Sequence, residues 1–189
     1  MPKCLFSILD QYLKLGWKVY KKQLIKQARR IQNENNMARV NIGICPRYLS
    51  DQHLIAESVE ITMITGGLRK NGYQIKSEIP DVFNIGKGHI NFFKNKLYYL
   101  NKRLLAVNKE LGNRNIRHST KIDLGEFPSE LRGDWNPHWH DSAIIRDRVY
   151  IRLIRPLKAR EGFHRYYKNP IRDMKWFADK MLSSELFEV

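Results

Sequence analysis

The clearest hydrophobic periodicity in the chain lies between residues 90 and 111. Apolar side chains there recur at alternating spacings of three and four, which places them on one face of an α-helix. Gly112 follows directly and is expected to end that helix. We therefore expect one long helix with a core-facing stripe made of Ile90, Phe93, Leu97, Leu100, Leu104, Val107 and Leu111.

A second helix is predicted over residues 51–70. Ser50 or Asp51 can cap its start by accepting hydrogen bonds from free N–H groups. Arg69 and Lys70 fall in the last turn, where cations suit the helix dipole, and Gly72 provides the stop. Residues 39–45, which come before it, are expected to form an extended arm. The predicted apolar stripe of the helix is Leu54, Ile61, Ile64 and Leu68.

A third helix is expected from residue 141 to residue 155, where Pro156 stops it. One face carries apolar residues, and another carries Arg148, Arg152 and Arg155 at helical spacing, a basic stripe suited to phosphate contact. Gly and Pro recur through residues 113–137, which predicts a loop-rich connection. Residues 174–182 have the pattern of a tail helix. The inward-facing residues of the third helix are expected to be Ile144, Ile145, Val149 and Leu153.

Residues 1–36 combine apolar and basic positions in the pattern of a basic amphipathic helix followed by a polar linker. Such a helix could bind DNA or a membrane surface, or could simply pack its apolar stripe on the rest of the protein. These patterns predict a mainly α fold: a compact single domain of three principal helices with loop-rich connections, plus an N-terminal basic helix and a C-terminal tail helix. The expected divisions are residues 1–36, 37–169 and 170–189.

The chain of 189 residues has a formal net charge of +15, with 34 Lys and Arg against 19 Asp and Glu. This excess favours a polyanionic partner, and nucleic acid more than an anionic membrane. Cys4 and Cys45 do not have the spacing of a metal or redox motif. No apolar run approaches the length of a membrane span or a signal-peptide core, so we expect a soluble, cytoplasmic protein.

Four sequence blocks follow one another between residues 37 and 169. In this order they resemble the bacteriophage pyrimidine-dimer DNA glycosylases, small enzymes that also cut the strand at the abasic site. The blocks are Arg39-Val40-Asn41 with Asp51-Gln52-His53-Leu54 and Glu60; residues 85–93, IGKGHINFF; residues 131–138, LRGDWNPH; and residues 164–168, HRYYK.

The resemblance implies excision of a damaged base at a UV-induced pyrimidine dimer and then AP-lyase cleavage. In that family the nucleophile is the N-terminal amine after loss of the initiator Met, and the matching position here is Ala38. The family's catalytic glutamate matches Glu60. Ala38 follows thirty-seven residues in this chain, so the α-amine exists only if translation begins at Met37 or a protease exposes Ala38.

The resemblance also implies a DNA-binding surface and no cofactor. His53 could contact a sugar or phosphate or tune Glu60, and the tyrosines could stack on bases or serve as packing. Val59 and Met63 depart from the family, which has arginines at these positions. The predicted DNA-binding residues are Arg39, Gln52, His53, Arg69, Arg148, Arg152, Arg165, Tyr166 and Tyr167.

Two other functions are compatible with the residues. The chain could be a non-catalytic DNA-binding protein on the same scaffold, or a metal-dependent endonuclease whose ligands come from Asp134, His138, His140 and Asp141. The resemblance argues against a metal, because strand cutting in the family does not require one. The expected partner is double-stranded DNA that contains lesions, with no membrane partner, and the protein is expected to be a monomer.

Overall fold

The computed structural model describes residues 40–85, 88–154 and 164–183, all within one compact unit, Asn36–Val189. These residues are mainly helical, which confirms the predicted fold class. The predicted N-terminal basic helix, Ala38, Arg39 and the end of the tail lie outside the described residues. The elements are η1 (Pro46–Tyr48), α2 (Asp51–Lys70), α3 (His89–Phe92), α4 (Leu97–Asn113), η2 (Leu124–Glu126), η3 (Ser129–Leu131), α5 (Trp139–Ile154), β1 (Arg165–Tyr166), β2 (Asn169–Pro170) and α6 (Met174–Ser183).

The helix α2 forms where the sequence predicts it. The Ser50 side chain accepts a hydrogen bond from the His53 N–H and so caps the first turn. At the other end Gly72 takes a positive φ of 60°, a conformation that costs glycine little. The predicted apolar stripe of α2 is buried along its whole length: Leu54, Ile61, Ile64 and Leu68.

The prediction of one continuous helix over residues 90–111 is wrong in its first turns, because the helix is interrupted between α3 and α4. Lys96 forms a β-bridge with Arg132, and the Tyr98 N–H donates to the Gly133 carbonyl at 3.1 Å. A segment distant in sequence thus takes the backbone hydrogen bonds that a continuous helix would need. Ile90, the first residue of the expected stripe, is 37% exposed, whereas the other six stripe residues are buried.

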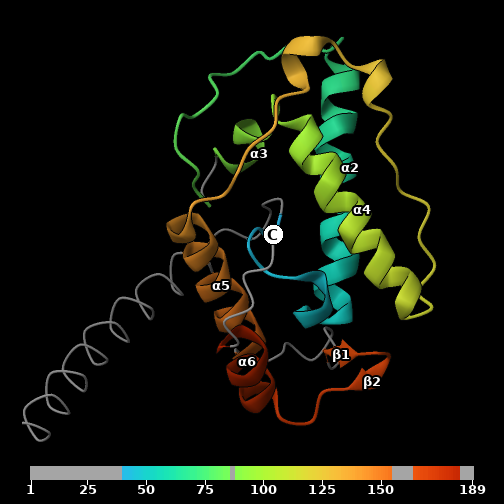
Figure 1. Cartoon of the computed structure of the whole chain (residues 1–189), viewed down its shortest axis with the longest axis vertical. Helices are drawn as coiled ribbons and strands as arrows, with labels where there is room; N and C mark the ends of the chain where they lie inside the picture. The colour runs from blue at the N-terminus through green and yellow to red at the C-terminus, as the bar shows by residue number, and fades with distance from the viewer. Residues whose placement is uncertain (1–39, 86–87, 155–163, 184–189) are drawn as a thin grey trace, which may run out of the picture. The chain divides into compact units, whose positions relative to one another are not determined.

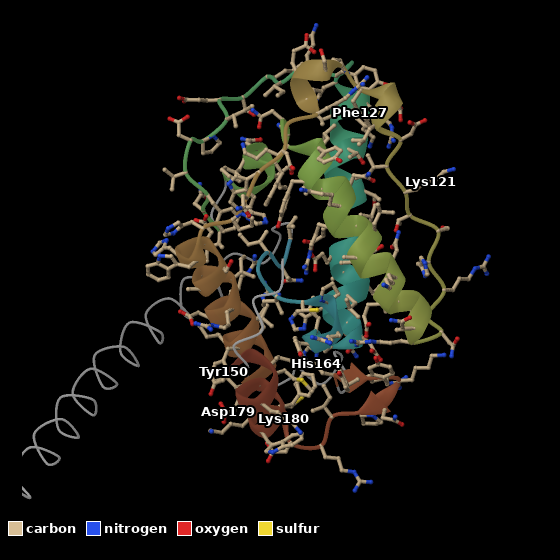
Figure 2. The ribbon with its side chains drawn as sticks, viewed as in Figure 1. Lys121, Phe127, Tyr150, His164, Asp179 and Lys180 are labelled. Atoms are coloured by element: carbon tan, nitrogen blue, oxygen red, sulfur yellow. The ribbon has the colours of Figure 1, made fainter. Side chains whose placement is uncertain are left out.

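The described core forms between two pairs of helices. The helices α2 and α4 lie side by side, and α5 lies beside α6 (Figure 1). The Tyr150 hydroxyl donates to Asp179 Oδ1 at 3.0 Å and joins α5 to α6 (Figure 2). A cluster of aromatic rings, which includes Phe83, Phe93 and Trp135, packs where α3, α4 and the loop before α5 meet.

The helix α5 begins two residues earlier than expected, at Trp139, and Arg155 lies outside the described residues. Ile145, Val149 and Leu153 are buried, as the apolar pattern predicts. Arg148 is buried as well, with 5% of its surface exposed, so the basic stripe is not uniformly open to solvent. Among the described helices, none is long and apolar enough to cross a membrane.

Candidate active site

The segment of residues 40–45, here called the arm, is anchored on α2 through one buried carboxylate. The Asn41 backbone N–H donates to Glu57 Oε1 at 3.0 Å, and the Asn41 side-chain amide donates to Glu57 Oε2 at 2.9 Å. Glu57 is completely buried. The predicted arm is therefore not a free extended segment: Val40 and Ile42 are both fully buried in the core.

Arg103 of α4 completes this cluster with a bidentate ion pair to Glu57. Its Nε lies 2.7 Å from Oε1 and its Nη2 lies 3.0 Å from Oε2, while Nη1 donates to the Ile44 carbonyl at 2.8 Å. Burial by itself would lower the pKa of Arg103, but the charge and the hydrogen bonds of Glu57, with smaller effects of Tyr99 and Cys45, together raise that pKa. One carboxylate thus joins α2, α4 and the arm.

Glu60, the predicted catalytic carboxylate, lies one helical turn after Glu57 on α2. Residues three apart on a helix share a face, with Cβ atoms about 5–6 Å apart. Glu60 is half-buried, and its Oε2 atom is shielded from solvent. Glu60 therefore lies one turn from the residue that anchors the arm, while Ala38 and Arg39 lie outside the described residues.

His53 lies at the start of α2 in a small cluster with a second histidine. The Ser50 Oγ atom is 2.7 Å from His53 Nδ1 and 3.3 Å from His164 Nδ1. The two imidazole rings stack with centroids 5.4 Å apart and 7° between their planes. His53 is 5% exposed and His164 is half-buried, beside the hairpin (Figure 2). The sequence did not predict this pair, because the two histidines are 111 positions apart.

The β1–β2 hairpin brings three of the predicted DNA-binding residues to the same end of α2. The Gln52 side-chain oxygen accepts a hydrogen bond from the Arg165 backbone N–H at 2.8 Å. The Tyr166 hydroxyl donates to the Arg47 carbonyl at 2.9 Å, and the Tyr167 hydroxyl donates to Glu110 Oε1 at 3.1 Å. Gln52 and both tyrosine hydroxyls therefore help to hold the hairpin in place.

A buried arginine, Arg114, packs against the two tyrosines of the hairpin. Its guanidinium lies 4.7 Å from the ring centroids of both Tyr166 and Tyr167. It also bonds Asp51 Oδ1 at 2.8 Å and Glu110 Oε1 at 2.7 Å. The sequence did not predict this arginine and its two carboxylate partners. The one local signal is the i,i+4 spacing of Glu110 and Arg114.

Arg69 lies apart from these residues, at the opposite end of α2. Its guanidinium makes a bidentate ion pair with Glu126, at 2.7 and 2.8 Å, and lies over the Phe127 ring. The hydrogen bond to Glu126 raises the pKa of Arg69 and lowers that of Glu126. The structure does not bring Arg69 together with Glu60 or His53.

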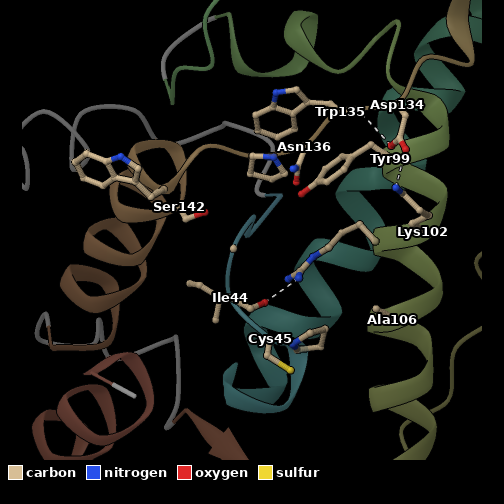
Figure 3. A pocket seen from close by; sticks show the side chains of 14 residues that line it. Ile44, Cys45, Tyr99, Lys102, Ala106, Asp134, Trp135, Asn136 and Ser142 are labelled. Atoms are coloured by element: carbon tan, nitrogen blue, oxygen red, sulfur yellow. Dashed lines mark hydrogen bonds and ion pairs between the residues drawn. The ribbon is translucent and has the colours of Figure 1, made fainter. Parts of the chain in front are cut away.

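A pocket of about 870 Å³ opens between the arm, α4 and the start of α5 (Figure 3). The side chains of Cys45, Tyr99 and Trp135 line it, and at its edge Lys102 makes a 2.7 Å ion pair with Asp134. Neither Glu60 nor His53 lines this pocket. It meets the Glu57 cluster through Arg103 and Ile44, which line one of its walls.

The residues considered as metal ligands are arranged for other contacts. Asp134 pairs with Lys102, whose hydrogen bond lowers the pKa of Asp134. Asp141 Oδ2 accepts from the His138 backbone N–H at 3.0 Å, next to the start of α5. In the part of the chain that the structure describes, no three His, Cys, Asp or Glu side chains come together as a metal site.

The chain is strongly basic, its described part is mainly helical, and a basic excess of this size favours a nucleic-acid partner. Residues 37–124 match the family model described as pyrimidine dimer DNA glycosylase. These residues make up a little less than half of the chain, and over them it resembles that family of DNA glycosylases. The match includes Glu57, Glu60 and Arg103 and ends before the hairpin.

Proposed function

We propose that this protein excises a damaged base at UV-induced pyrimidine dimers and then cuts the strand by β-elimination. The nucleophile is the α-amine of Ala38 in a chain that begins there, and the carboxylate is that of Glu60. The observation that carries the proposal is the anchoring of the arm: Asn41, three residues after Ala38, is bound to Glu57, one turn from Glu60. The family match supports pyrimidine-dimer glycosylase activity in general.

The chemistry requires a neutral amine beside an ionised carboxylate. The amine nitrogen forms a bond to C1′ of the sugar while the bond between C1′ and the pyrimidine breaks, and the base leaves with that electron pair and a proton. The amine then loses a proton, the sugar ring opens and a C1′ imine forms. Removal of a C2′ proton expels the 3′ phosphate. Glu60 stabilises the positive sugar and transfers protons.

The cluster at the start of α2 supplies the DNA contacts in this proposal. The half-buried His164, stacked on the buried His53, presents an imidazole there, and the hairpin presents the exposed Arg165 next to it. Arg152 on α5 contributes a further cation. Flipping a damaged nucleotide costs least where pairing is already weakened, which favours dimers over intact DNA.

The test compares Glu60→Gln with Glu78→Gln, a change at an exposed glutamate in the loop after α2. Both variants are made in a chain that begins at Ala38, which retains the whole described core. We expect Glu60→Gln to slow base release from dimer-containing duplex by about a hundredfold or more, while DNA affinity stays close to that of the control. Base release equal to that of Glu78→Gln would remove Glu60 from the mechanism.

The product and the start site separate this proposal from its alternatives. Cleavage should continue in EDTA and leave an unsaturated sugar at the 3′ end; a magnesium requirement with a 3′-hydroxyl product would favour a hydrolytic endonuclease. Borohydride should trap the chain that begins at Ala38 on DNA, and should trap the chain that begins at Met1 or Pro2 poorly. Absence of trapping with every form would favour a non-catalytic DNA-binding protein.

A further inference from the structure

The start of the described chain is fixed by a second buried group besides Glu57. The Val40 backbone N–H donates to Nε2 of His89 at 3.4 Å. Farther along the arm, Gly43 has a positive φ of 69° and lies so close to Ser142 of α5 that a side chain would collide with it. The blue segment that precedes α2 therefore has little freedom between α2 and α5 (Figure 1).

His89 is suited to accept a hydrogen bond rather than to carry a charge. It is completely buried, and the rings of Phe83 and Phe93 pack edge-on against it with centroids 5.3 and 5.2 Å away. Burial, assisted by the nearby positive charge of Arg148, lowers the pKa of His89 to about 4. At neutral pH the Nδ1–H donates to the Asn84 carbonyl at 3.1 Å, which leaves Nε2 as the acceptor for Val40.

The distance along the chain connects this contact to the chemistry. Two residues of extended chain span at most about 7 Å, so the amine of a chain that begins at Ala38 cannot lie farther than this from the Val40 nitrogen. Glu57, one turn before Glu60 on α2, accepts a hydrogen bond from the backbone N–H of the next residue, Asn41. The two contacts together fix the backbone of Val40 and Asn41, to which the first two residues are joined.

We infer that His89 is a positioning residue, whose acceptor nitrogen holds the backbone of Val40, two residues from the proposed Ala38 nucleophile. The inference rests on the proposed function, since it requires Ala38 to supply the nucleophile. Orientation of a nucleophile is a large part of catalysis, and a displacement of about 1 Å can cost a hundredfold in rate. His89 acts through Val40 and does not contact the substrate.

The test uses two substitutions that differ in one property. His89→Leu fills similar space without an acceptor, whereas His89→Gln retains an amide oxygen that can accept from Val40. In chains that begin at Ala38, we expect His89→Leu to slow borohydride trapping at saturating DNA by about 10–100-fold. His89→Gln should recover most of that rate. The Kd for DNA should be nearly the same in both variants.

A second variant leaves the core unchanged and keeps the test decisive if His89→Leu folds poorly. One glycine inserted between Arg39 and Val40 preserves the contacts of Val40 and Asn41 but moves the amine by about 3.5 Å. We expect this chain to trap slowly and to bind DNA normally.

Equal trapping by His89→Leu and His89→Gln, or normal trapping by the insertion variant, would overturn the positioning role while leaving the proposed function intact. Absence of trapping by the unmodified chain that begins at Ala38 would overturn both.

Discussion

Acidification from pH 8 to pH 5 should lower the free energy of unfolding by about 2 kcal/mol through His89 alone. In an unfolded chain this imidazole binds a proton with a pKa of 6.5, whereas in the folded protein its pKa is about 4. Between these two values the unfolded state holds more protons than the folded state, so stability increases with pH. The full contribution is present above pH 6.5 and is lost as the pH falls through about 4, a total of about 3 kcal/mol.

Urea unfolding at a series of pH values measures this effect, and a variant isolates it. Carboxylates also titrate below about pH 5, so the informative quantity is the difference between the unmodified protein and His89→Gln, which cannot titrate at that position. This difference should shrink by about 2 kcal/mol between pH 8 and pH 5. The matched control is His118→Gln, because His118 is exposed.

A direct proton NMR titration gives an independent value for the same group. The His89 ring should remain neutral until the pH approaches 4. An NMR pKa near 6.5, or parallel pH dependences in the unmodified protein and His89→Gln, would refute the conclusion that burial keeps this ring uncharged.

Two further predictions concern Arg114, which packs against the hairpin, and the exposed face of α2. Arg114→Met should lower the free energy of unfolding by about 3–5 kcal/mol in urea, because it leaves two buried carboxylates without their shared cation; a loss no larger than that of Arg117→Met, at an exposed site, would contradict this. Val59→Arg, at a position 48% exposed beside Glu60, should tighten DNA binding and steepen the salt dependence of log K by about 0.9. Leu105→Arg on α4 controls for the added charge, and an equal gain there would show that the effect is not specific to α2.

The sequence alone determined the features that depend on local spacing. The α2 helix begins with the Ser50 cap and buries the predicted stripe, and α4 buries the five apolar residues of the predicted stripe that it contains. Periodicity and caps act within a few residues, so they can be read without a fold. The blocks at residues 39–60 and 85–93 likewise indicated the family whose model residues 37–124 match.

Only the tertiary structure decided which polar groups work together. Glu57 and Arg103 are 46 residues apart, and Val40 and His89 are 49 apart, so no local pattern could have paired them. The break before α4 arises because Gly133 supplies a carbonyl from a distant loop. A helical pattern shows which face is buried, but the partner that satisfies a buried charge or N–H is chosen by packing.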